Sequence, residues 1–147
     1  MTAGEVCNRQ VVVTRPDMWL VEAVNLMRTH HVGDLVVLRE PDGERVPIGI
    51  VTDRDIALAV DRLLRLPQLK VADVMSADLV TSPEHESLYD ALKKMQSYGI
   101  RRLPVVNERG GLEGILTFDD VLELLSEELT DLAKLVAKEQ KRERLTR

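Results

Sequence analysis

Two copies of one short phrase carry the side chains in this sequence that are best suited to hold a ligand. Each copy has the pattern Gly, two apolar residues, Thr, two further residues and Asp; the copies run from Gly49 to Asp55 and from Gly114 to Asp120. An apolar stretch precedes each threonine and a helical pattern follows each aspartate, so the threonine is expected where a strand meets a helix. The phrase therefore places a hydroxyl and a carboxylate one helical turn apart.

This pairing of groups suits a nucleotide. The first N–H groups of a helix have no partner within the helix and its dipole favours an anion, so a phosphate could dock beside Thr52 or Thr117. The carboxylates of Asp55 and Asp120 could each accept hydrogen bonds from two adjacent ribose hydroxyls. The alternative is a capping box, which stabilises a helix by about 1 kcal/mol without any ligand. Two copies in register favour ligand binding.

A pair of arginines is the next candidate for binding phosphate. Arg101 and Arg102 precede a predicted strand, and guanidinium groups hold phosphate oxygens bidentately. A solvated surface pair is the alternative. Gly33 and Asp34 occupy the equivalent positions in the first half of the chain, which puts an acid where the second half has a cation. The two sites are therefore predicted to be unequal.

No residue pattern indicates catalysis or a metal centre. The sequence has no Gly-x-Ser-x-Gly and no Walker-type Gly-Lys-Ser/Thr, and nothing suggests a pairing of cysteine with histidine. His30, His31 and His85 are not at ligand spacing with other donors, so surface or helix-end roles are expected for them. Trp19 is interpreted as a core residue or, alternatively, as part of a ligand pocket.

The elements that must position these groups form a duplication. Reading each half in order gives strand, helix, strand, strand and helix. In the first half these are expected at residues 11–14, 20–27, 35–38, 47–51 and 56–64, with a turn at 41–43. In the second half they are expected at residues 79–81, 88–95, 102–106 and 112–116, followed by the last helix, with a turn at 107–111. The segments that lead into the two repeats, which we call the lead-in segments, also align: residues 6–8 correspond to residues 74–76.

These repeats give the predicted boundaries. The first repeat covers residues 5–65, a connection covers 66–73, the second repeat covers 74–128, and residues 129–147 form a helical extension and tail. In the last helix Leu122, Leu125, Leu129, Leu132 and Val136 have the spacing of a coiled-coil seam. The stripe is shorter than a full coiled coil requires, so it is expected to pack on its own protomer or to close a dimer.

Composition limits the class of protein. The chain has 147 residues, of which 44% are hydrophobic and 31% charged, as in an ordinary globular protein in which both repeats share one core. A net charge of −5 argues against a general nucleic-acid binder. The single Cys7 fits a reducing compartment, so a cytoplasmic location is expected. We expect no leader and no membrane span.

The duplication, the paired phrases and the run from Ile100 to Val106 resemble the tandem CBS-domain family, the cystathionine-β-synthase-type regulatory module. The resemblance covers about residues 5–128. It implies a mixed α/β (α+β) fold of two pseudo-symmetric βαββα repeats packed sheet to sheet, with an extended C-terminal helix. It also implies that the arginines face the phosphates of a nucleotide in the cleft closed by Thr52 and Asp55. The ligand-binding set that follows is Thr14, Trp19, Thr52, Asp53, Asp55, Thr81, Ile100, Arg101, Arg102, Pro104, Thr117 and Asp120.

The resemblance also implies a function. The chain is expected to be a non-enzymatic module that binds an adenine nucleotide and alters its association with a separate, unidentified target protein. AMP is the first candidate ligand; ATP, ADP, NADH and S-adenosylmethionine remain open, as does a role for magnesium. A structural oligomerisation module with degenerate sites is the alternative. A disc-shaped homodimer is expected through the apolar face of residues 56–64, without nucleic acid or membrane.

Overall fold

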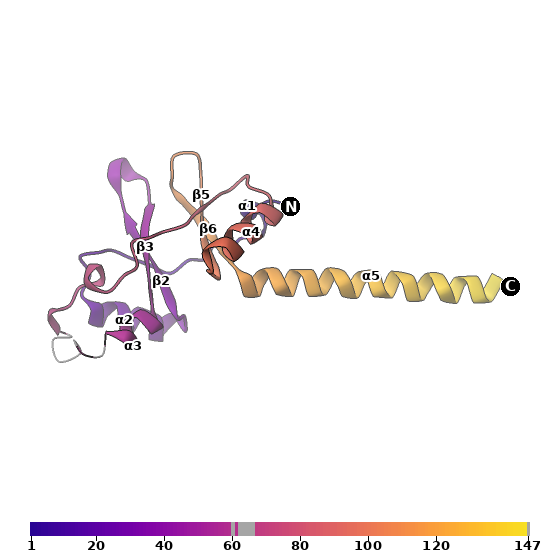
Figure 1. The fold of residues 1–147 in the computed structure, drawn as a ribbon, viewed down its shortest axis with the longest axis horizontal. Helices are drawn as coiled ribbons and strands as arrows, with labels where there is room; N and C mark the ends of the chain where they lie inside the picture. The colour runs from indigo at the N-terminus through magenta and orange to yellow at the C-terminus, as the bar shows by residue number, and fades with distance from the viewer. Residues whose placement is uncertain (60, 62–66, 147) are drawn as a thin grey trace.

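The computed structural model describes residues 1–59, 61 and 67–146 and contains two small sheets flanked by helices (Figure 1). The chain begins with the short helix α1 (Ala3–Val6). The first half then contains β1 (Val13–Thr14), α2 (Leu20–His30), β2 (Asp34–Arg39), β3 (Val46–Thr52) and α3 (Asp53–Leu58). The second half contains β4 (Ser82–Pro83), α4 (Leu88–Tyr98), β5 (Arg102–Val106), β6 (Leu112–Thr117) and α5 (Phe118–Thr146). Short 3-10 turns lie at Pro41–Gly43 and Val71–Asp73.

The two sheets have the same topology, as the duplication predicts. In each, the short strand pairs in parallel with the middle strand, and the middle strand pairs antiparallel with the last. The sheet orders are therefore β1-β2-β3 and β4-β5-β6. Val36 and Leu38 of β2 are buried in one cluster with Ile115 of β6, so the sheets pack on one another. The predicted α+β fold with a C-terminal helix is confirmed.

The helices α2 and α4 are equivalent amphipathic elements. Each buries three residues at spacings of three and four: Leu20, Ala23 and Met27 in α2, and Leu88, Ala91 and Met95 in α4. Ser87 caps α4 through a hydrogen bond from the backbone N–H of Asp90 to its hydroxyl. Both helices end on a left-handed residue, His31 with φ 54° and Gly99 with φ 63°. The apolar spacing in the sequence therefore predicted both helices correctly.

The segment that leads into each repeat packs on the other repeat. Ala3 of α1 is buried in the core of the second half, and Asn8 forms a bridge with Ile115 of β6. Val71 is buried in the core of the first half, and Ser76 forms the equivalent bridge with Ile50 of β3. The sequence repeats are therefore not separate in space, because each core is completed by the lead-in of the other repeat.

Two strand predictions need correction. The predicted strand at residues 79–81 is wrong: the parallel partner of β5 is Ser82–Pro83, where Ser82 faces Val105. At Leu79 the backbone instead forms a tight turn, in which the N–H of Leu79 donates to the carbonyl of Ala77 at 2.9 Å. The predicted strand at residues 11–14 is shortened to Val13–Thr14. Both short strands thus begin later than their apolar runs suggest.

The predicted apolar helix at residues 56–64 is only partly visible. Helix α3 ends at Leu58, whose side chain is 70% exposed. Residues 60 and 62–64 of the prediction lie outside the described residues. The homodimer face proposed for this helix therefore stays a prediction.

Helix α5 extends away from both sheets (Figure 1). Val121 is buried in the core of the second half and Leu124 packs against it, but every residue from Leu125 to Thr146 is exposed. Of the two alternatives for the apolar stripe, packing on its own protomer is wrong, because Leu122, Leu125, Leu129, Leu132 and Val136 are all exposed. The other alternative, closing a dimer, stays a prediction.

Candidate functional site

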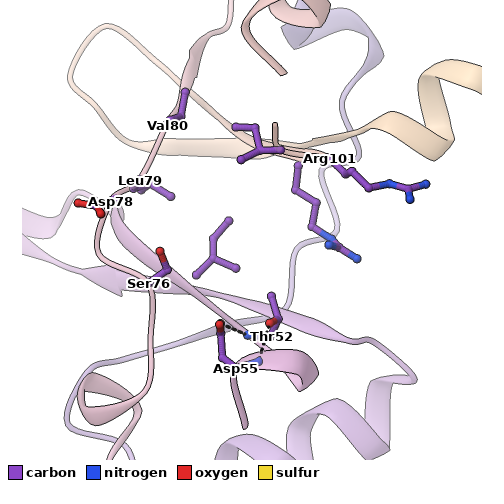
Figure 2. A pocket seen from close by; sticks show the side chains of 10 residues that line it. Thr52, Asp55, Ser76, Asp78, Leu79, Val80 and Arg101 are labelled. Carbon is purple, nitrogen blue, oxygen red and sulfur yellow. Dashed lines mark hydrogen bonds between the residues drawn. The ribbon is translucent and has the colours of Figure 1, made fainter. Parts of the chain in front are cut away.

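The phrase from Gly49 to Asp55 borders a cavity of about 260 Å³ between the two repeats (Figure 2), which we call the first cleft. Thr52 at the end of β3 and Asp55 in the first turn of α3 lie on one side. Residues that precede or open β5 lie on the other. The full lining is Ile50, Thr52, Asp55, Ser76, Asp78, Leu79, Val80, Ile100, Arg101 and Arg102.

The first cleft combines an apolar wall with polar groups at one edge. Ile50, Leu79, Val80 and Ile100 supply apolar surface, which suits the faces of a planar ring system. The carboxylate of Asp55 can accept hydrogen bonds, and the guanidinium groups of the paired arginines can donate them. The cavity therefore offers separate places for a base, for hydroxyl groups and for an anion.

A complete capping box links Thr52 and Asp55. The N–H of Asp55 donates to Thr52 Oγ1 at 3.0 Å, and the N–H of Thr52 donates to Asp55 Oδ2 at 2.9 Å. The N–H of Asp53 donates to the carbonyl of Gly33 at 2.8 Å, and that of Arg54 to Asp53 Oδ1 at 2.8 Å. The N–H groups of Asp53, Arg54 and Asp55 at the start of α3 thus already have acceptors within the protein. They are therefore not free to bind the phosphate predicted to dock beside Thr52. Among the described residues Asp55 Oδ1 has no hydrogen-bond donor, so it can accept a hydrogen bond from a ligand.

The phrase from Gly114 to Asp120 borders a second cavity of about 310 Å³, the second cleft. Thr117 accepts a hydrogen bond from the N–H of Asp120 at 3.1 Å. The other side is formed by the first repeat, including Gly33 and Asp34, as the duplication predicts. The full lining is Asn8, Gln10, Val11, Val12, Val32, Gly33, Asp34, Arg101, Arg102, Ile115, Thr117, Asp119 and Asp120.

The arginines lie between the two clefts and line both of them. Arg102 forms an ion pair with Asp34, and Arg101 pairs with Asp119 at 2.9 Å while lying over the ring of Phe118. The prediction gave both cations to the first cleft and only an acid to the second. The arginines do line the first cleft and Asp34 does line the second, but the expectation that the second cleft has no cation is wrong. The strand that carries Arg102 lies close enough to β2 for the cation to reach Asp34.

The charges still differ between the clefts. Around the shared arginines, the first cleft has the acids Asp55 and Asp78, and the second has Asp34, Asp119 and Asp120. The second cleft therefore has one acid more than it has cations. The expectation of unequal sites keeps a physical basis, although the difference is smaller than the sequence suggested.

Five residues of the predicted set line neither cleft. Trp19 is 45% exposed at the start of α2, with Lys70 Nζ 5.1 Å from its ring centre. Thr14 is buried, and its hydroxyl donates to Met18 Sδ at 2.9 Å. The remaining three have local roles: Asp53 accepts from the N–H of Arg54, the carbonyl of Thr81 accepts from Lys94 Nζ at 3.0 Å, and Pro104 is buried in β5.

The lead-in segments supply cleft residues that the sequence reasoning missed. Residues 76, 78, 79 and 80 line the first cleft, and residues 8, 10, 11 and 12 occupy the equivalent positions in the second. The alignment of residues 6–8 with 74–76 was visible in the sequence. It marked these segments as part of the repeat but did not show that each crosses to the other half.

Asp34→Asn is expected to strengthen nucleotide binding at the first cleft by up to about fivefold, the range of a partly exposed ion pair. Arg102 then loses its partner and its charge becomes available to a phosphate. Isothermal titration calorimetry on the variant and the wild type measures the change. Glu40→Gln, which removes a comparable exposed ion pair with Arg15 away from the clefts, is the control. A weaker affinity in Asp34→Asn would mean that the ion pair positions Arg102 for the ligand.

The described part of the chain shows neither a metal site nor a membrane segment. Among these residues no three His, Cys, Asp or Glu side chains are grouped to hold an ion. None of the helices in the same ranges combines the length and the apolar character that a membrane crossing requires.

Comparison with known proteins gives a consistent family match. The sequence model of the CBS domain matches residues 3–62 and 71–127. An uncharacterized protein of Methanopyrus kandleri is 38% identical over 125 residues, which are 84% of this chain and 62% of that protein. The chain thus spans less than two thirds of this relative.

Two solved structures show the same fold. The CBS domain pair of protein MJ0100, in complex with 5'-methylthioadenosine and S-adenosyl-L-methionine, has a TM-score of 0.74 at 22% identity, covering 87% of this chain and 98% of that one. The cytosolic domain of the Mg2+ channel MgtE, in complex with ATP, has a TM-score of 0.71 at 26% identity. That match covers 84% of this chain and 48% of the MgtE chain.

Proposed function

This chain belongs to the CBS domain family and carries two CBS repeats, and from this premise we propose that it is a non-enzymatic regulatory module that binds an adenine nucleotide between the repeats. Binding would shift the module between states that differ in affinity for a separate target protein. The cytoplasm is the proposed location, for which the single Cys7 is the support.

The observation that carries the proposal is the composition of the first cleft. Ile50, Leu79 and Val80 offer apolar contact to a base, and Asp55 keeps one carboxylate oxygen for the ribose hydroxyls. Arg102 lies at the same cavity as a partner for phosphate oxygens. These three requirements meet in one cavity although the residues come from both halves of the chain.

The structural relatives support the ligand class. Solved complexes of similar folds contain S-adenosyl-L-methionine, 5'-methylthioadenosine or ATP, which share an adenosine group. We propose AMP as the preferred member, because Asp55 and Asp78 offset the charges of the two arginines at the first cleft. The cavity then has little net positive charge to hold a longer phosphate chain unless a cation accompanies that chain. Magnesium would therefore matter more for ATP than for AMP.

A ligand-dependent rise in melting temperature tests the proposal. A ligand that binds only the native state stabilises it by RT ln(1 + [L]/Kd), about 2.7 kcal/mol at a hundredfold excess over Kd. The panel is AMP, ADP, ATP, NADH, S-adenosylmethionine and cyclic di-AMP, with and without magnesium, and calorimetry measures each affinity. UMP is the matched control, because it has the same phosphate without a purine. A melting temperature unchanged by every compound would contradict nucleotide binding.

Trp19 is an internal control for the same titration. Because its ring lies beside Lys70 and lines neither cleft, saturating nucleotide is expected to leave its emission nearly unchanged. This outcome replaces the alternative in which Trp19 is part of a ligand pocket. A large emission change would place a ligand elsewhere or require the 3-10 turn at Val71–Asp73, next to Lys70, to move.

A structural oligomerisation module is the second candidate. The observation that favours it is the exposed apolar stripe of α5, whose residues line neither of the two clefts. Under this function the chain would self-associate with the same strength with or without nucleotide. The two candidates therefore differ in the ligand titration and share the expectation of a homodimer.

A further inference from the structure

The apolar stripe of α5 is a surface without a partner in one copy of the chain. Five residues at alternating spacings of three and four remain largely in contact with water. Their exposures are 52% for Leu122, 39% for Leu125, 67% for Leu129, 58% for Leu132 and 52% for Val136. A stripe with this spacing is the seam of a two-stranded coil, and so many exposed leucines on one line indicate an interaction surface.

The helix that carries the stripe also lacks support from the body. Beyond Leu124 no residue of α5 is buried or half-buried. In water most helical stability comes from packing of the apolar face against another element. A second helix along the stripe would supply that packing.

Charge along α5 is divided into two halves of opposite sign. Residues 119–131 contain six acids and no base, whereas residues 134–146 contain five bases and two acids. The sign changes between Asp131 and Lys134, within the apolar stripe. A helix of the same kind laid parallel would place acid beside acid and base beside base, but an antiparallel one would place each half beside its opposite.

From these two features we propose that α5 pairs antiparallel with α5 of a second copy of this chain. The charge pattern complements itself under a two-fold axis, which is the symmetry of most homodimers. In the register that pairs four of the five stripe residues with one another, Leu129 lies opposite Leu132 of the partner subunit and Leu125 lies opposite Val136 of the partner subunit. The acidic segment of each copy then runs beside the basic segment of the other.

Distances between spin labels test both the pairing and its direction. Thr130→Cys and Lys141→Cys are made separately in a Cys7→Ser background, because both positions are exposed. In the antiparallel pair, residue 130 of each copy lies near the two-fold axis, and its two labels project from the faces opposite the seam. Their separation is therefore about 20 Å, which is the usual distance of about 10 Å between packed helices plus the outward reach of both labels. Labels at residue 141 lie opposite residue 120, about 30 Å from each other along the helices. A parallel pair would give short distances at both positions.

A seam variant shows that the stripe causes the pairing. The double variant Leu129→Asp with Leu132→Asp is expected to abolish the short distance at residue 130. If no other interface holds the copies together, the apparent dimer dissociation constant measured by ultracentrifugation should also rise at least tenfold. The control is Thr130→Asp with Ala137→Asp, which adds the same charges to the opposite face of α5. Because residue 130 is then changed, the label is moved to Ser126→Cys. This control should keep the pairing. Short distances at both 130 and 141 overturn the antiparallel direction.

Two further results would overturn the proposal altogether. One is a monomer at tens of micromolar, an ordinary working concentration for interfaces of moderate strength. The other is a dimer in which labels at residue 130 are far apart, since another surface would then join the copies. If the monomer instead sediments with vesicles of anionic phospholipid, the basic end of α5 binds a membrane surface and the occupant named here is wrong.

Discussion

Arg102→Ala is expected to weaken adenine nucleotide binding at the first cleft by roughly ten- to a hundredfold, the effect of losing one charge-assisted hydrogen bond of about 1.5–3 kcal/mol. Arg102 lines the same cavity as Thr52 and Asp55. The substitution also leaves Asp34 without its ion-pair partner, which adds an unpaired acid close to the phosphate. Calorimetric titration with AMP measures the change in affinity.

Two control variants separate this effect from a general loss of structure. Arg109→Ala removes an equally cationic side chain that pairs with Glu44 far from the clefts, and it should bind AMP as the wild type does. Arg102→Ala with Asp34→Ala removes both members of the ion pair and should recover part of the affinity, since the uncompensated acid is gone. Wild-type affinity in Arg102→Ala itself would show that contacts to the base, and not the phosphate, determine binding.

Gly114→Ala is expected to lower the melting temperature by roughly 3–10 °C, the equivalent of about 1–3 kcal/mol of overpacking in a chain of this size. A Cβ atom at this position would lie 2.6 Å from Cys7 Sγ and 2.7 Å from the carbonyl oxygen of Asn8. Gly49→Ala should have a similar effect, because its Cβ would lie 2.6 Å from the carbonyl oxygen of Ser76. In both cases the obstacle includes the backbone of a lead-in segment, which cannot turn aside as a side chain can.

The reactivity of Cys7 measures the displacement of the lead-in segment independently of the melting temperature. Burial raises the pKa of the Cys7 thiol above its ordinary value, so little thiolate is present at neutral pH and reaction with a thiol reagent is slow. Gly114→Ala should accelerate that reaction by displacing the lead-in segment, and Gly49→Ala should not. Gly33→Ala is the matched control for stability, since its nearest neighbour is the end of the Asp53 side chain at 3.0 Å. Equal losses of stability in all three variants would contradict the steric explanation.

The sequence by itself determined the repeated architecture. The two phrases ending in Asp55 and Asp120 showed the duplication, because their residue types recur in register. Apolar residues at spacings of three and four predicted α2 and α4. Pairs of apolar runs separated by turn residues predicted the hairpins of β2 with β3 and of β5 with β6. These are local signals, since the period of the apolar residues follows from helix and strand geometry. The pairing of Thr52 and Asp55 with a cleft that includes the arginines was also foreseen.

Only the tertiary structure decided which segments and charges meet. The crossing of each lead-in to the other repeat depends on contacts between residues far apart in the chain, such as Asn8 with Ile115, and no local pattern encodes them. The same is true of Arg102, whose distance from Asp34 depends on how the two sheets pack. The glycines of the two phrases were visible as a motif, but their reason is the close approach of a backbone from the other half. The stripe on α5 was legible in the sequence, whereas its exposure follows from the direction in which the helix leaves the body.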